Sequence, residues 1–180
     1  MSDLISKPLA STLVLKAESF ATKAHFHQKR KYTGQPYIIH PRNVANIVSK
    51  FEHNDNIICA AWLHDTVEDT NVKLNDIKNI FGDKIAELVD DLTKVSTFKD
   101  GNRKARKEKD LIHISKALPA AKTIKLADII DNVSTIKDFD PDFAKIYIPE
   151  KIEMLKVLKE GNLELFNITD NLLKKLNIWI

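Results

Sequence analysis

Apolar residues recur at three- and four-residue steps along almost the whole chain, which is the spacing that one buried face of a helix requires. The clearest stripes are Leu9, Leu13, Ala17, Phe20 and Ala24; Val44, Ile47, Val48 and Phe51; Ile85, Leu88, Val89 and Leu92; Leu126, Ile129, Ile130, Val133 and Ile136; Ile148, Ile152, Leu155 and Leu158; and Leu165, Ile168, Leu172 and Leu176. No alternating run is flanked by hairpin turns. Turn-forming residues predict breaks between helices at Gly34-Gln35-Pro36, Asn54-Asp55, Thr70-Asn71, Gly101-Asn102, Pro119, Asp140-Pro141 and Gly161-Asn162. The pattern predicts an all-α fold, a single helical bundle of about eight to ten helices.

Composition limits the class of protein further. Hydrophobic residues make up 43% of the 180 residues, which favours a packed core over disorder. No linker-like stretch divides the chain, so we expect one domain over residues 1–180, with its motifs in a core of about residues 20–160. No apolar run approaches the roughly 20 residues that cross a bilayer, and the first residues do not resemble a signal peptide. We therefore expect a cytoplasmic protein with no membrane partner.

The charge of the chain gives little indication of a nucleic-acid partner. The net charge is only +3, and no DNA- or RNA-recognition motif accompanies the basic residues. Six cations and three anions do gather in the segment 99–110. This segment is either a solvated helix face or a patch that faces the phosphates of a small polyanion. We expect no nucleic-acid partner.

Two pairs of polar residues, His64-Asp65 and Glu68-Asp69, close a long apolar stretch. Imidazole and carboxylate groups are costly to bury unless something pairs with them, and a divalent cation would provide that partner. We expect residues 56–68 to form one helix. His64 and Glu68 would then lie one turn apart, with Asp65 beside both. The cluster predicts a metal-centred active site.

Two further residues are candidate metal ligands from elsewhere in the chain. His40 follows a turn and precedes a helix, and Asp128 interrupts an apolar helical stripe. Taken singly, each has an ordinary explanation, as a capping histidine and as a hydrogen-bonded aspartate. Imidazole nitrogen and carboxylate oxygen together suit Mn²⁺, Fe²⁺, Zn²⁺ or Mg²⁺, so the metal is left open by the ligand types.

The order His40, His64-Asp65, Asp128 on helices resembles the HD superfamily of metal-dependent phosphohydrolases. Three segments are similar, more specifically, to the hydrolase domain of RelA/SpoT-type alarmone enzymes. They are RKYTGQPYIIHP at residues 30–41, HDTVEDT at 64–70, and KLAD at 125–128 followed by Asn132. The chain also resembles the small alarmone hydrolases of the Mesh1 type in its length.

This resemblance implies that the chain is a (p)ppGpp 3′-pyrophosphohydrolase, which converts ppGpp or pppGpp to GDP or GTP and pyrophosphate. It assigns His40, His64, Asp65 and Asp128 to one Mn²⁺ ion, Glu68 and Asp69 to the hydrolytic water, Arg30 and Lys31 to the base and phosphates, Asn132 and Thr135 to the nucleoside pocket, and Tyr147, whose spacing differs from the family pattern, to substrate binding. The partner would then be a small nucleotide, and the protein a monomer or a small homo-oligomer.

Two positions depart from the family pattern. Ile129 and Asp131 stand where the family has Arg and His. On a helix Asn132 faces the same way as Asp128, whereas these two residues point to either side, toward the core or solvent. If Asp131 faced the pocket instead, its negative charge would oppose a polyphosphate.

Two other functions stay open at this point. One is another HD nucleotide phosphohydrolase, such as a deoxynucleotide or NADPH phosphatase. The other is a non-catalytic protein, either an alarmone-binding sensor or an antitoxin. The segment 30–34 together with the pair Glu68-Asp69 favours the alarmone hydrolase. Neither base preference nor the individual roles of the two carboxylates follows from the sequence.

Overall fold

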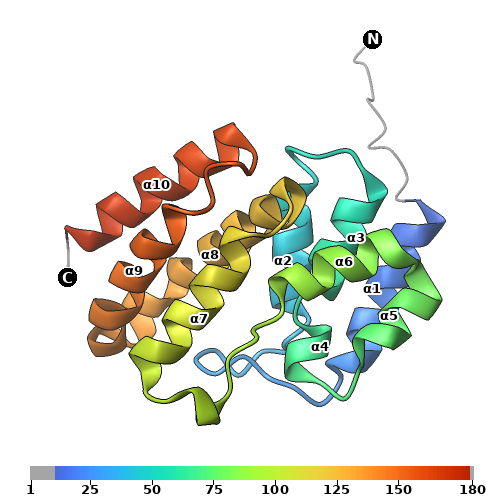
Figure 1. Cartoon of the computed structure of the whole chain (residues 1–180), viewed down its shortest axis with the longest axis horizontal. Helices are drawn as coiled ribbons and strands as arrows, with labels where there is room; N and C mark the ends of the chain where they lie inside the picture. The colour runs from blue at the N-terminus through green and yellow to red at the C-terminus, as the bar shows by residue number, and fades with distance from the viewer. Residues whose placement is uncertain (1–10, 179–180) are drawn as a thin grey trace.

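The part of the chain that the computed structural model describes, residues 11–178 without the side chains of Thr135 and Lys137, is helical throughout. Its elements are α1 (Thr12–Ala24), α2 (Ile39–Val48), α3 (Asp55–Leu63), α4 (Thr66–Asp69), α5 (Leu74–Phe81), α6 (Asp83–Leu92), a 3-10 turn η1 (Phe98–Asp100), α7 (Arg103–Ser115), α8 (Pro119–Phe139), α9 (Pro141–Leu155) and α10 (Leu163–Asn177), shown in Figure 1. Within these residues the extended pairing is a single bridge between Lys29 and Pro36. The predicted all-α fold is confirmed.

The longest helix, α8, lies in the middle of the bundle (Figure 1). Its apolar residues point to more than one side, and Ile124, Leu126, Ala127, Ile129 and Val133 are all buried. Because α8 is apolar on several sides, several helices cover it: α2, α3, α6, α9 and α10. A polar residue on such a helix must pair with another polar group or line a cavity, because water does not reach it otherwise.

The predicted breaks coincide with helix ends because side chains there satisfy free backbone groups. N-cap side chains accept hydrogen bonds from the first helical turn at Asn54 of α3, Asn102 of α7, Asp140 of α9 and Asn162 of α10. Pro119 and Pro141 occupy the first turns of α8 and α9, where no backbone N–H is needed.

The segment with the His-Asp pair differs from the single helix predicted over residues 56–68: α3 ends at Leu63 and α4 is a separate short helix. Polar side chains cause the break by taking the carbonyls that a continuous helix would use. The Thr66 hydroxyl donates to the carbonyl of Leu63 at 2.7 Å, and His64 Nδ1 donates to that of Ala61 at 2.8 Å. The His-Asp pair therefore lies in the turn between α3 and α4.

The buried face of α10 is also rotated from the predicted stripe. Leu165, Thr169 and Leu173 are its buried residues, whereas Ile168 is 42% exposed. Apolar residues cover a wide arc of this helix, so the spacing alone fits more than one orientation. Leu9, from the first predicted stripe, lies outside the described residues.

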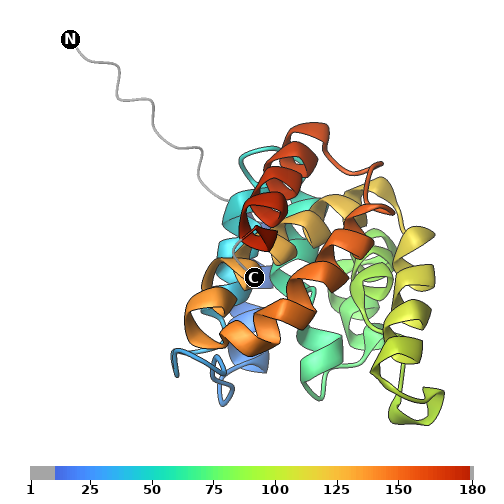
Figure 2. The same cartoon turned by 90° about the vertical axis from the view of Figure 1, so that its left-hand side faces the viewer.

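Figure 2 turns α9 and α10 toward the viewer and shows how the remaining segments flank them. The segment 25–38 lies along one side, α7 lies along the other, and α4 lies between the two. None of the helices in residues 11–178 combines the length and the apolar character needed to cross a membrane.

Candidate active site and metal centre

Four predicted metal ligands meet at the start of α2, at the turn between α3 and α4, and on α8. The Nε2 atoms of His40 and His64 are 3.3 Å apart. Asp65 Oδ2 lies 3.1 Å from His64 Nε2 and 3.3 Å from His40 Nε2, and Asp128 Oδ1 lies 3.3 Å from His40 Nε2. Ligand atoms about 2.1 Å from one ion and at right angles are roughly 3.0 Å apart, so the observed spacing fits a shared cation.

The two histidines present the ring nitrogen that a metal needs. Both are almost fully buried, at 1% and 2% exposure. His40 Nδ1 donates to Asp131 Oδ2 at 2.6 Å, and His64 Nδ1 donates to the Ala61 carbonyl at 2.8 Å. With Nδ1 engaged as the donor in each ring, both Nε2 atoms point into the cluster, and they are the atoms that would bind a cation there.

The electrostatics of the cluster also favour a cation. Burial of the His40 ring disfavours its charged form, yet the surrounding carboxylates outweigh burial and raise its pKa to about 11. Burial likewise works against ionisation of Asp65 and Asp128, but the His64 charge for Asp65 and the Lys125 charge for Asp128 hold their pKa values well below the usual range. The site is therefore a buried pair of carboxylates that stabilises positive charge at the imidazole nitrogens.

Asp131 is a site residue that the sequence analysis did not identify. We had expected its side chain to point toward the core or solvent. Besides His40, its carboxylate accepts from Asn43 Nδ2 at 2.7 Å and lies 3.3 Å from Arg30 Nη2. It orients the His40 ring, and its charge is balanced by Arg30, so it does not oppose a polyphosphate from within the pocket. Ile129 is fully buried in the core, which is one of the two directions expected for it. The sequence signal that could have identified Asp131 is its position three residues after Asp128 on the same helix, where side chains are neighbours.

Replacing Asp131 with alanine is expected to weaken Mn²⁺ affinity by about 10- to 100-fold, because a metal-binding histidine depends on the partner of its second nitrogen. Calorimetric titration of the metal-free protein with Mn²⁺ measures this directly. Asp138→Ala, which removes an exposed acid from the same helix, is the control. Equal Mn²⁺ affinities of the two variants would contradict this role of Asp131.

Tyr37 is a second site residue that sequence reasoning missed, although it stands within the motif at residues 30–41. Its hydroxyl lies 2.6 Å from Asp65 Oδ2 and 3.0 Å from Asp69 Oδ2, and it donates to one of them at a time. Burial, with the two carboxylate charges, raises the pKa of this hydroxyl, so it keeps its proton. Glu68, the neighbour of Asp69 on α4, forms an ion pair with Lys94. The two predicted catalytic carboxylates thus border the metal cluster from α4.

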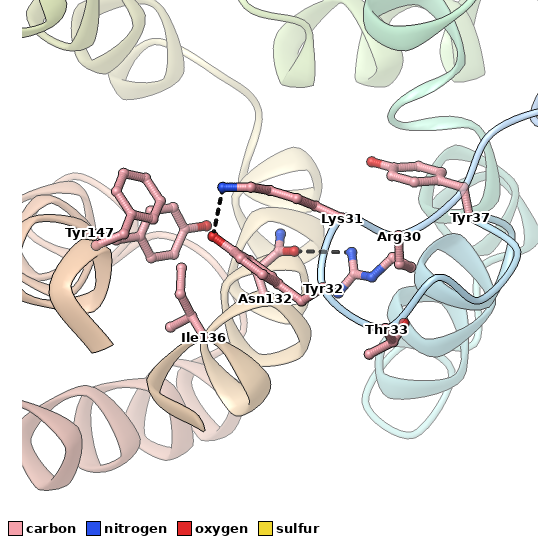
Figure 3. A pocket seen from close by; sticks show the side chains of 9 residues that line it. Arg30, Lys31, Tyr32, Thr33, Tyr37, Asn132, Ile136 and Tyr147 are labelled. Carbon is pink, nitrogen blue, oxygen red and sulfur yellow. Dashed lines mark hydrogen bonds between the residues drawn. The ribbon is translucent and has the colours of Figure 1, made fainter. Parts of the chain in front are cut away.

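A cavity of about 280 Å³ adjoins this cluster and is shown in Figure 3. It is lined by Arg30, Lys31, Tyr32, Thr33, Tyr37, Asn132, Ile136, Phe143 and Tyr147. Asn132 links the cavity to the metal cluster, because its amide donates to Asp128 Oδ1 at 2.5 Å and accepts from Arg30 Nη1 at 3.2 Å. The volume approaches the lower end of the range for small-molecule sites, about 300 Å³.

The structure brings together most of the residues predicted to bind substrate. Arg30, Lys31, Asn132 and Tyr147 all line this cavity, from the 25–38 segment, α8 and α9. Lys31 is largely exposed and its ammonium lies 3.1 Å from the Tyr32 hydroxyl, as Figure 3 shows. Thr135 belongs to α8, but its side chain is outside the described part of the structure.

Comparison with known proteins identifies the fold around this site. A family model described as HD domain matches residues 17–149. The chain belongs to the HD-domain family. The matched residues include the whole metal cluster, both carboxylates of α4 and the lining of the cavity.

Relatives of this HD domain share its site-bearing part. The guanosine-3′,5′-bis(diphosphate) 3′-pyrophosphohydrolase of Aquifex aeolicus is 38% identical over 141 residues, which are 78% of this chain and 20% of that protein. The human enzyme of the same name, MESH1, is 36% identical over 132 residues, 72% of either chain. The chain thus spans about a fifth of the bacterial relative and most of the human one.

A solved structure extends the similarity of this HD domain to the three-dimensional level. It is described as a metazoan orthologue of SpoT that hydrolyses ppGpp and plays a role in starvation responses. The TM-score is 0.83 at 26% identity, over 94% of this chain and 97% of that one. The helical arrangement described above is therefore that of an HD-domain protein over nearly its whole length.

Proposed function

We propose that this HD-domain protein is a metal-dependent 3′-pyrophosphohydrolase that converts ppGpp or pppGpp to GDP or GTP and pyrophosphate. The observation that carries the proposal is the direct contact between the metal cluster and the nucleoside-sized cavity, through Asn132 and Asp128. A nucleotide bound in this cavity would lie beside the residues that would hold a divalent ion. The names of the relatives supply the substrate.

The lining of the cavity suits a nucleoside. The rings of Tyr32, Phe143 and Tyr147 offer aromatic faces on which a base stacks, and stacking does not depend strongly on which base is bound. Arg30 and Lys31 line the same cavity and offer hydrogen-bond donors to phosphate oxygens, although Asp131 and Asp140 already offset their charges. Asn132 lies between base and metal and would contact the ribose.

His40, His64, Asp65 and Asp128 would hold the divalent ion, which supplies Lewis-acid chemistry when bound: it acidifies water and offsets charge on phosphoryl oxygens. We assign the orientation of the attacking water to Glu68 and Asp69, which border the cluster. The water oxygen bonds to the phosphorus on the ribose 3′ oxygen, and the bond to that oxygen breaks. One of these carboxylates takes the proton that the water loses and passes it to the leaving 3′ oxygen.

Several finer predictions belong to the same proposal. We propose Mn²⁺ as the ion, since the imidazole and carboxylate set suits it among other metals. A cytoplasmic location, a monomer or small homo-oligomer, and one domain over residues 1–180 also remain predictions.

Incubation of the purified chain with Mn²⁺ and ppGpp, followed by anion-exchange chromatography, tests the proposal. We expect the wild type to release GDP and pyrophosphate, and the Asp65→Ala variant to leave ppGpp intact because a metal ligand is lost. Intact ppGpp together with turnover of NADPH or a deoxynucleotide would instead favour another HD phosphohydrolase. Binding of ppGpp without turnover of any nucleotide would favour a sensor or an antitoxin.

A further inference from the structure

A second, smaller cavity lies on the far side of the metal cluster from the nucleoside cavity. Its volume is about 30 Å³, room for about two water-sized groups, and four lysines line it: Lys94, Lys107, Lys125 and Lys151. We call it the lysine cavity. These lysines come from the loop after α6, from α7, from α8 and from α9. Of the six cations in the segment 99–110, only Lys107 reaches this cavity.

The acids that also line the lysine cavity are engaged elsewhere. Asp110 accepts hydrogen bonds from the backbone of Val95 and from both the backbone and hydroxyl of Ser96. Asp91 accepts from the backbone N–H of Leu118 at 2.9 Å. Neither carboxylate forms an ion pair with the lysines among the described residues, so the ammonium groups that line the cavity are not held by these two acids.

Two of the four lysines already have acidic partners in the active site. Lys94 forms an ion pair with Glu68, and Lys125 Nζ lies 2.8 Å from Asp128 Oδ2. Within residues 11–178, no hydrogen bond or ion pair engages Lys107 or Lys151. Lys107 and Lys151 therefore line the cavity without a direct acidic partner.

Lys151 is the more unusual of these two lysines, because it is only 8% exposed. Its ammonium faces the Tyr147 ring at 4.7 Å from the centroid, a contact that only partly replaces an anion. Burial and the charges of Lys125, Lys107 and Lys94 lower its pKa to about 7. A largely buried amine that has no acidic partner favours the binding of an anion beside it.

The positions of these residues along α8 and α9 relate the two cavities to the metal cluster. Along α8, Lys125 lines the lysine cavity, Asp128 belongs to the metal cluster, and Asn132 lines the nucleoside cavity, each about one turn after the last. Along α9 the order is reversed, with Tyr147 at the nucleoside cavity and Lys151 at the lysine cavity. Figure 2 agrees, since α4 lies between the 25–38 segment and α7. A substrate that spans both cavities has its reacting phosphorus beside the metal cluster.

We infer that the lysine cavity binds the outer phosphate of the 3′-pyrophosphoryl group, with Lys151 as its buried cation. This inference rests on the proposed function. The nucleoside occupies the larger cavity, the phosphorus on the 3′ oxygen lies at the metal cluster, and the outer phosphate reaches the lysines. When the bond to the 3′ oxygen breaks, the pyrophosphate stays on the lysines while GDP stays in the nucleoside cavity.

Product inhibition of the full chain tests this division of the substrate. Lys151→Met keeps the length of the side chain and removes its charge. We expect this variant to weaken inhibition by pyrophosphate about 10- to 100-fold at constant free Mn²⁺, and to leave inhibition by GDP unchanged. Lys145→Met, which removes an exposed charge from the same helix, is the control. Lys107→Met, at a half-buried position, is expected to act in the same direction.

Thermal unfolding gives a second measurement that needs no turnover. Lys151→Met is expected to raise the Tm of the ligand-free protein by about 2–4 °C, since an unpaired buried charge is lost, and to abolish stabilisation by pyrophosphate. Equal pyrophosphate inhibition in wild type and Lys151→Met, with ppGpp still hydrolysed, would overturn this inference alone. Pyrophosphate binding through Lys151 in a wild type that leaves ppGpp intact would support the anion site and refute the proposed function.

Discussion

Replacing His64 with alanine is expected to remove both tight metal binding and hydrolysis of ppGpp. Its Nε2 lies 3.3 Å from that of His40 and 3.1 Å from Asp65 Oδ2, so it completes one side of the ligand cluster. A divalent ion contributes several kcal/mol to phosphoryl transfer, and about 4 kcal/mol corresponds to a rate loss of roughly 1,000-fold. We expect kcat/KM to fall by at least about that factor.

Two comparisons separate this effect from a general loss of structure. His53→Ala removes an exposed histidine and should keep wild-type activity and metal content. Asp65→Asn keeps the size of the side chain and should lose activity as His64→Ala does. Metal content by mass spectrometry and the Tm of the metal-free proteins complete the set. A His64→Ala protein that retains one tightly bound ion and normal kcat would refute the assignment of His64 as a ligand.

The Glu68→Gln and Asp69→Asn variants are expected to lose hydrolysis while still binding the metal. Both residues lie on α4, which directly follows Asp65: Asp69 shares the Tyr37 hydroxyl with Asp65, and Glu68 forms an ion pair with Lys94. Neither is within the ligand set itself. Removal of a general acid or base lowers the rate by about 100- to 10,000-fold, and we expect kcat to fall in this range.

The comparison of kcat with Mn²⁺ affinity shows whether these carboxylates act on the reaction or on the ion. Single-turnover kinetics at saturating Mn²⁺ gives the first, and calorimetry gives the second. Glu87→Gln, at an exposed position of α6, serves as the control. A fall in Mn²⁺ affinity that fully accounts for the lost rate would make Glu68 and Asp69 part of the metal site.

The fold could be predicted from the sequence because both the buried faces and the starts of its helices leave a local pattern in it. Apolar stripes indicated the helices, and Asn54, Asn102 and Asn162 marked their starts through local hydrogen bonds. Both kinds of signal act over a few residues, so they can be seen without the tertiary structure. The break after Leu63 was missed because Thr66 and His64 side chains replace backbone donors there, which no apolar spacing reveals.

Within the candidate site, the residues of the motif were identified but two of their partners were not. Asp131 contacts His40, which lies 91 positions away along the chain. Tyr37 contacts Asp65 and Asp69, which lie 28 and 32 positions away. Such pairings depend on how α2, α4 and α8 pack. Lys151 was missed for the same reason, since a lysine in a helical stretch is ordinarily solvated.

The order of polar residues on α8 fixes the spacing between the two cavities. Because α8 is packed on several sides and rises about 1.5 Å per residue, the separation between the cation at Lys125 and the amide at Asn132 is close to fixed at roughly 10 Å. Inserting one residue between them would rotate every later residue of α8 by about 100°, so this separation cannot be lengthened in small steps. Under the proposed function, a difference in which nucleotide binds must then come from the side chains on α8 and α9, and not from a change in the length of the helix that carries them.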